Sequence, residues 1–209
     1  MRNYLFISVA AASLTLAGYA YADPPDQPAH VSPQPGTAND TVSAVKDVAG
    51  HLVGTVSAEM TTKLPDFVAA AAVSDMYEVE AGKIAQQRAR DAGVRSFAAK
   101  MVTAHTESTD KLKSLLDAAN ISVAAPAVLD DRRQSMIDEL RGETDADFDG
   151  RYLSQQIEAH NEALLLMKGF AKNGDTASVR KFAAKLVPVV RSHLNMANHL
   201  YAGLKKSTS

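Results

Sequence analysis

Apolar residues recur every three or four positions from about residue 64 onward, which is the period of amphipathic helices and not of strands. The pattern predicts four long helices and a short one, which span 66–90, 94–120, 145–172, 176–205 and 129–140 respectively. Tight breaks at 91–93 and 173–175 join the long helices into two antiparallel pairs. We therefore predict an all-α, ferritin-like four-helix bundle over residues 64–205, with one long crossover that carries the short helix.

The first 22 residues have the layout of a secretory signal peptide. Arg2 precedes an apolar run over residues 4–17, and Ala20-Tyr21-Ala22 offers a cleavage site after Ala22. The run is shorter than the roughly 20 residues that span a membrane, and no later stretch approaches that length. We expect a soluble, exported protein without a transmembrane span, located in a bacterial periplasm, where it can associate with the outer membrane, or outside the cell.

Two further segments separate the signal peptide from the bundle. Residues 23–41 contain five of the eight prolines and almost no large apolar side chain, so we expect a disordered tether. Residues 42–63 have a weak amphipathic pattern that Gly50 and Gly54 interrupt. This segment either rests on the bundle as a marginal helix or, through residues 42–60, binds a membrane surface or a protein partner.

Charge and cysteine content narrow the classes of partner. The formal net charge is −2, and the 22 basic residues are scattered among 24 acidic ones. Nucleic acid is not an expected partner, because a surface that tracks phosphates needs a concentrated positive stripe. The chain contains no cysteine, so the hydrophobic core must hold the fold without disulfides.

Three histidines lie on the apolar faces of three different long helices: His105, His160 and His193. The first long helix carries Glu80 on its own apolar stripe. Glu80 lies 12 residues before the centre of the first turn and His105 lies 13 after it, so we expect the two to be level. Counted in the same way from the second turn, His160 and His193 differ in height along the bundle by about 7 Å. A kink at Pro188 could reduce this difference.

These four side chains form a candidate site for one divalent metal ion, Fe²⁺, Mn²⁺ or Zn²⁺; the ligands would be Glu80, His105, His160 and His193. The alternative is a buried polar network, in which each histidine bonds to Glu80, Tyr152 or a backbone carbonyl because unpaired polar groups are costly in a core. The sequence is compatible with both.

Four more residues are candidates to support the site: Glu78, Asp149, Tyr152 and Gln156. Asp149 and Tyr152 lie one turn apart, where they could orient a histidine, although Asp149 also supplies favourable charge to a first helical turn. Gln156 matches the level of His193 better than His160 does. Glu78 points about 200° around the helix from Glu80, so we expect it at the solvated rim.

Three stretches resemble the bacterial exported family called domain of unknown function 4142: FVAAAAVSDMYEVEAGKIAQQRARDAGVRSFAAKMVTAHTESTDKL, DFDGRYLSQQIEAHNEAL and VRKFAAKLVPVVRSHLNMA. Together they cover about Asp66 to Leu200. The residues that match the family pattern are Glu78, Glu80, His105, Phe148, Asp149, Tyr152, His160, Pro188 and His193. The resemblance implies a ferritin-like bundle in a family that is often labelled as outer membrane proteins and has no agreed activity.

The resemblance does not extend to the di-iron site of ferritin-like proteins. That site uses Glu-x-x-His on two helices, whereas valines lie three residues before His105 and His193. We expect an exported binding or envelope-associated accessory protein with a His/Glu metal site in its core. The alternatives are a metal-dependent periplasmic redox enzyme in peroxide or stress defence, and a structural interaction module whose polar core fixes helix register.

Overall fold

The computed structural model describes residues 60–207, and every regular element in this range is a helix. The expected signal peptide, the tether and residues 42–59 of the amphipathic segment lie outside the described residues. The helices are α2 (Leu64–Arg88), α3 (Ala92–Ala118), α4 (Asp131–Gly142), α5 (Phe148–Asn173) and α6 (Ala177–Ser207). The prediction of an all-α bundle is confirmed, with helix ends that differ from the expected ones by up to three residues.

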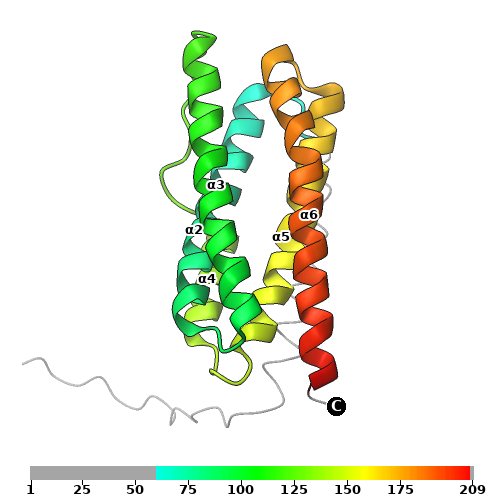
Figure 1. Ribbon diagram of the computed structural model, residues 1–209. Helices are drawn as coiled ribbons and strands as arrows, with labels where there is room; N and C mark the ends of the chain where they lie inside the picture. The colour runs from blue at the N-terminus through cyan, green and yellow to red at the C-terminus, as the bar shows by residue number, and fades with distance from the viewer. Residues whose placement is uncertain (1–59, 208–209) are drawn as a thin grey trace, which may run out of the picture. The chain divides into compact units, whose positions relative to one another are not determined.

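The four long helices form a ring in the order α2, α3, α6, α5 (Figure 1). Helices α2 and α3 form one antiparallel hairpin, α5 and α6 form the other, and the hairpins pack through α2 against α5 and α3 against α6. The connection from α3 to α5 returns along the bundle and carries α4, which packs on α2 and α5. The three helices that carry the candidate histidines therefore surround the same interior.

The buried apolar side chains form two clusters, one toward each end of the bundle. One cluster surrounds Tyr77, Phe97 and Tyr152, and the other surrounds Phe67 and Phe170, whose rings stack with centroids 4.2 Å apart. Polar side chains are also buried between the helices, among them all three candidate histidines. Because burial in such an environment disfavours unpaired polar atoms, these side chains require hydrogen-bond or metal partners.

Two aspartates of the α5–α6 hairpin accept backbone hydrogen bonds from the α2–α3 hairpin, one at the α2–α3 turn and one at the start of α2. Asp149 of α5 accepts hydrogen bonds from the backbone N–H groups of Arg90 and Asp91, at 3.0 and 2.8 Å. Asp175, in the turn between α5 and α6, accepts from Leu64 N–H at 3.1 Å. Asp149 thus secures the α2–α3 turn, and the expectation that it orients a histidine is wrong. Asp66 lies inside the first turn of α2, where its negative charge is favourable.

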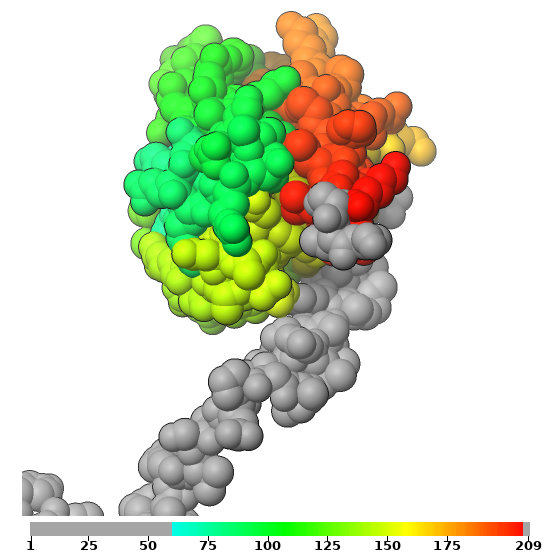
Figure 2. Space-filling model, turned by 60° about the horizontal axis from the view of Figure 1, so that its bottom comes forward, coloured from blue at the N-terminus to red at the C-terminus, as the bar shows by residue number. Residues whose placement is uncertain are grey.

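Helix α4 is fixed to the bundle by arginines. Arg88 of α2 donates to the backbone carbonyls of Leu140 and Glu143, at 2.7 and 2.6 Å. Arg133 of α4 is buried and donates to Glu162 of α5 at 2.7 Å. Figure 2 brings forward the end where α2 turns into α3 and shows the yellow-green segment around α4 and the start of α5 lying beside it. The connection therefore covers α2 and α5 on their outer side.

Candidate metal centre

His105 of α3, His160 of α5 and His193 of α6 converge in the interior of the bundle. Their ring centroids are 5.5 to 6.0 Å apart, and one ring nitrogen from each lies within 4.8 Å of the other two. Their exposed fractions are only 7%, 1% and 4%. The expected offset of about 7 Å between His160 and His193 is therefore wrong.

The position of the turn between α5 and α6 explains why the expected offset between His160 and His193 was too large. The turn is centred near residue 175, because α5 ends at Asn173 and α6 begins at Ala177. This centre reduces the offset between His160 and His193 to three residues, or about 4.5 Å of rise. Side chains lean toward the N-terminus of their own helix, so on two antiparallel helices these rings lean toward one another and close the remaining gap.

Two of the three imidazoles are held at one ring nitrogen and unpaired at the other. His105 Nδ1 donates to Asp75 Oδ1 at 2.7 Å, and His160 Nδ1 donates to the Gln156 carbonyl oxygen at 2.8 Å. His105 Nε2, His160 Nε2 and His193 Nδ1 are buried without a hydrogen-bond partner. Proteins orient metal-binding histidines in this way, with a carboxylate or carbonyl behind the ring and a free nitrogen in front.

The distances suit a metal ion after a small movement. Zn–N bonds of about 2.0–2.1 Å place tetrahedral ligand nitrogens about 3.4 Å apart. One ring nitrogen of each histidine lies within 4.8 Å of the other two, so the rings would have to approach one another by about 1 Å or slightly more to reach this spacing. An all-imidazole ligand set suits Zn²⁺, Cu²⁺, Fe²⁺ or Ni²⁺, whereas Mn²⁺ prefers oxygen ligands.

The environment keeps two of the rings neutral. Burial, together with the nearby charge of His105, lowers the pKa of His160 to about 3, and burial with the neighbouring histidines lowers that of His193 to about 3. Burial also acts to lower the pKa of His105, but the Asp75 hydrogen bond and the charge of Glu78 outweigh it and raise this pKa. A proton therefore competes with a metal mainly at His105.

Glu80 does not face the histidines, so its expected place in the ligand set is wrong. Its side chain is 37% exposed and accepts a hydrogen bond from Arg141 of α4 at 2.6 Å. Four of the ten buried residues of α2 are small, namely Ala71, Ala81, Gly82 and Ala85. Met76 and Ile84, the large apolar residues one turn before and after Glu80, lie on a face that is only partly buried.

Glu78 is the carboxylate that α2 buries in the core. It is 1% exposed, and its Oε1 lies 3.6 Å from His160 Nδ1, so the expected position at the solvated rim is wrong. Burial raises the pKa of Glu78, although His105 opposes this. Because Glu78 approaches the side of His160 that is bonded to Gln156, it lies behind this ring and not at the unpaired Nε2.

Tyr152 and Gln156 are buried near this carboxylate, and no hydrogen bond joins their side chains to a histidine within the described range. The Tyr152 hydroxyl and both side-chain polar atoms of Gln156 have no hydrogen-bond partner. Gln156 supports His160 through its backbone carbonyl, a role that any residue at this position would fill. Burial raises the pKa of Tyr152 well above its usual value, so its hydroxyl stays protonated.

Asp75 supports the centre and was missed by sequence reasoning. Its Oδ1 accepts from His105, and its Oδ2 accepts from the Thr109 hydroxyl at 3.0 Å. Since α2 ends at Arg88 and α3 begins at Ala92, the turn is centred at residue 90, and Asp75 and His105 each lie 15 residues from it. If the turn had been predicted two residues earlier in the sequence, Asp75 and His105 would have been predicted at the same level of the bundle.

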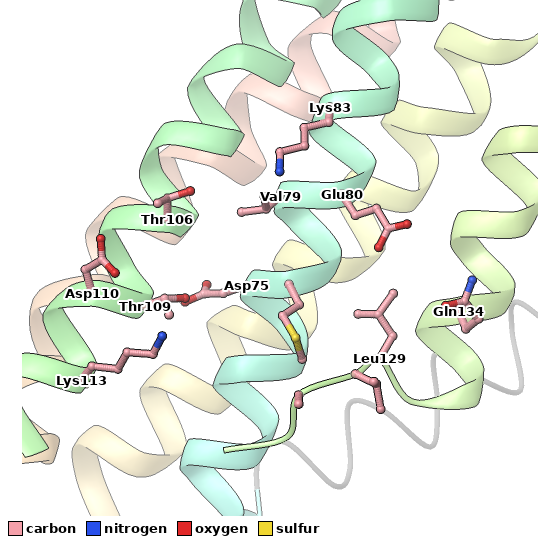
Figure 3. A pocket seen from close by; sticks show the side chains of 13 residues that line it. Asp75, Val79, Glu80, Lys83, Thr106, Thr109, Asp110, Lys113, Leu129 and Gln134 are labelled. Atoms are coloured by element: carbon pink, nitrogen blue, oxygen red, sulfur yellow. The ribbon is translucent and has the colours of Figure 1, made fainter. Parts of the chain in front are cut away.

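Asp75 also lines a pocket of about 650 Å³ on the outer side of the bundle, between α2, α3 and the connection to α4 (Figure 3). The figure shows Asp75 and Thr109 pointing toward each other, while Glu80 points toward α4. Carboxylates and lysines both line this pocket, including Asp110, Lys83 and Lys113. The carboxylate of Asp75 therefore separates an open pocket from a buried histidine.

The fold and the site define an all-α bundle with a buried three-histidine centre. Residues 53–200 match the family described as domain of unknown function (DUF4142), and the chain belongs to this family. No curated protein matches the chain. Within residues 60–207, no helix is long and apolar enough to cross a membrane.

A solved structure supports the fold independently. The crystal structure of a DUF305 fragment from Deinococcus radiodurans is similar to this chain, with a TM-score of 0.58 and 14% sequence identity. The similarity covers 66% of this chain and 94% of that one. At this identity the comparison bears on the helical architecture alone.

Proposed function

We propose that this protein is an exported metal-binding protein that holds one divalent ion through His105, His160 and His193. The observation that carries the proposal is the set of three buried ring nitrogens without hydrogen-bond partners. Each unsatisfied buried polar atom costs about 1–3 kcal/mol, and one metal ion would satisfy all three. Export is supported by the signal-peptide pattern of residues 1–22.

The ligand set favours Zn²⁺ among the metals expected from the sequence. Three imidazoles are borderline ligands that suit Zn²⁺, and two of them are neutral at physiological pH. With Glu80 directed away and Glu78 behind His160, no carboxylate joins the unpaired nitrogens, as Mn²⁺ would require. Cu²⁺ is the main competitor, because it binds nitrogen sites more tightly than Zn²⁺ does.

A structural role is the second candidate, and the hydrogen bonds of Asp75 favour it. Asp75 of α2 joins His105 and Thr109 of α3, so this part of the polar core links two helices without any ligand. Such a network would fix the register of the hairpin. It leaves His193 Nδ1 and His160 Nε2 unexplained, and for that reason we place it second.

Metal analysis of the purified full-length chain tests the proposal. We expect about one equivalent of metal by elemental analysis, and one Zn²⁺ bound per apo chain in a chelator competition titration. His193→Ala should lose this binding, whereas His199→Ala, which changes an exposed histidine on the same helix, should retain it. A wild-type chain that binds no Zn²⁺ at micromolar concentration would exclude the metal site, and a lower thermal stability of His105→Ala would then support the structural role.

A further inference from the structure

A small cavity of about 30 Å³ adjoins the three-histidine centre and has no role in the proposed metal binding itself. His105 and His193 both line it, and all four long helices contribute walls. Three of the residues that line it are alanines from different helices, namely Ala71, Ala104 and Ala163. The space exists because these side chains are short at the level next to the imidazoles.

We propose that this cavity is the binding position for a small exogenous ligand on the histidine-bound metal, of the class of water, hydroxide and small linear anions. The inference rests on the proposed function, because the ligand would bind to the metal. Three protein ligands leave one tetrahedral position open, an arrangement typical of catalytic and ligand-binding zinc sites and not of structural ones. Two of the three ligand residues, His105 and His193, line the cavity, and His160 does not, which favours an open position beside the first two.

The opposite side of the histidines is lined by large apolar side chains. Phe97, Met101 and Tyr152 are at most 4% exposed and belong to one packed apolar cluster there. Glu78 is also on that side, but it approaches the nitrogen of His160 that is already bonded to Gln156. An external ligand would therefore reach the metal from the cavity.

The size and lining of the cavity define the ligand. A cavity needs roughly 10–15 Å³ to hold one water molecule, so about 30 Å³ accommodates two or three atoms beyond the metal. Much of the lining is apolar, with Met167, Leu186 and Val190 beside the alanines. None of the residues that line it is a lysine or arginine, and Asp75 adds a carboxylate, so the metal would have to balance the charge of a bound anion.

The cavity also has a route to solvent between α3 and α6. Val189 lines it and is 42% exposed, and Ser108 and Leu186 are partly exposed. A ligand of two or three atoms can pass such side chains after small rotamer changes, whereas a larger molecule would have to separate the helices. The geometry thus selects for small ligands twice, at the entrance and at the site.

Cobalt substitution provides a direct test. Co²⁺ replaces Zn²⁺ in tetrahedral sites and has visible bands that report its ligands, so we would load the full-length apo chain with Co²⁺ and titrate it with azide. We expect a saturable change in the visible spectrum with azide and none with benzoate at the same concentrations. The benzoate comparison tests the size limit on the wild-type protein without any variant.

A matched pair of variants places the ligand in the cavity. Ala104→Leu should fill the space and weaken azide binding by at least about tenfold while Co²⁺ still binds, and Ala99→Leu, on the exposed face of the same helix, should behave as wild type. Failure of Co²⁺ to bind would overturn the proposed function itself. Binding of Co²⁺ without any response to azide would overturn only this inference, as would a Glu78→Gln variant whose altered Co²⁺ spectrum identifies Glu78 as the fourth ligand.

Discussion

At the scale of single residues, the function of this site depends on what stands behind each imidazole. His105 is backed by a carboxylate and His160 by a backbone carbonyl, so their free nitrogens are presented in fixed directions. Asp75 has the larger effect of the two supports, because its charge also makes His105 a stronger base. Sequence motifs point to the histidines, but the supporting groups determine whether they can act together.

Asp75→Asn should weaken metal binding without removing a ligand. The amide oxygen that this substitution introduces can still accept the hydrogen bond from His105 Nδ1, so the fold is retained, but the negative charge behind the ring is lost. We expect the affinity for Zn²⁺ to fall by about 10–100-fold in a chelator competition titration. Asp110→Asn, which changes an exposed carboxylate of the same outer pocket, is the control, and equal affinities of the two variants would contradict the prediction.

At the scale of helices, the bundle depends on contacts between the two hairpins at their turns. The carboxylate of Asp149 accepts two backbone N–H groups at the α2–α3 turn, and Asp175 accepts one at the start of α2. These bonds fix how far each hairpin extends along the other. Since the histidines come from both hairpins, the same bonds set the relative level of the rings.

Asp149→Asn should therefore destabilise the fold more than an ordinary surface change. The amide oxygen can accept one of the two N–H groups well, but the second bond and the charge are lost. We expect the free energy of unfolding in urea to fall by about 1.5–3 kcal/mol. Asp117→Asn on the exposed face of α3 should change it by less than about 0.5 kcal/mol. A similar small loss in both variants would show that the turn contact is dispensable.

Most of the helical architecture could be predicted from the sequence, because helix period and short turns are local signals. The face of α2 that is buried in the core could not be predicted in this way. Several of its residues are alanines, which give a weak apolar signal, while Met76 and Ile84 mark a face that is only partly buried. The choice of Glu80 over Glu78 follows from this. The position of Asp75 depends on a turn centred two residues earlier than expected, which is within the usual uncertainty of a helix end.

At the scale of the whole molecule, the buried histidines make folding sensitive to pH. In the unfolded chain a histidine has a pKa of about 6.5, whereas burial lowers the pKa of His160 to about 3. Between these values the unfolded state binds a proton that the folded state excludes. The stability that His160 contributes is thus present above pH 6.5 and is lost as the pH falls toward 3.

This difference can be measured on the apo protein by urea unfolding at pH 7.5 and pH 5. Over this interval His160 alone should remove about 2 kcal/mol of stability. His160→Gln, which does not titrate, should lose correspondingly less on acidification, whereas His199→Gln at an exposed position should lose as much as wild type. His105, with its raised pKa, acts in the opposite direction, and His193, whose pKa is lowered to about 3, acts in the same direction as His160 in all three proteins. Equal pH dependence of all three would argue against a neutral, buried His160.

The three histidines come from three helices and both hairpins of a chain that has no cysteine. An ion held by all of them would join points 55 and 33 residues apart, as a disulfide does, but through a reversible bond. A ligand that binds only the folded state at about 100 times its dissociation constant adds about 2.7 kcal/mol of stability. The stability of this fold would then depend on the metal concentration in its compartment and would not depend on the thiol redox conditions there.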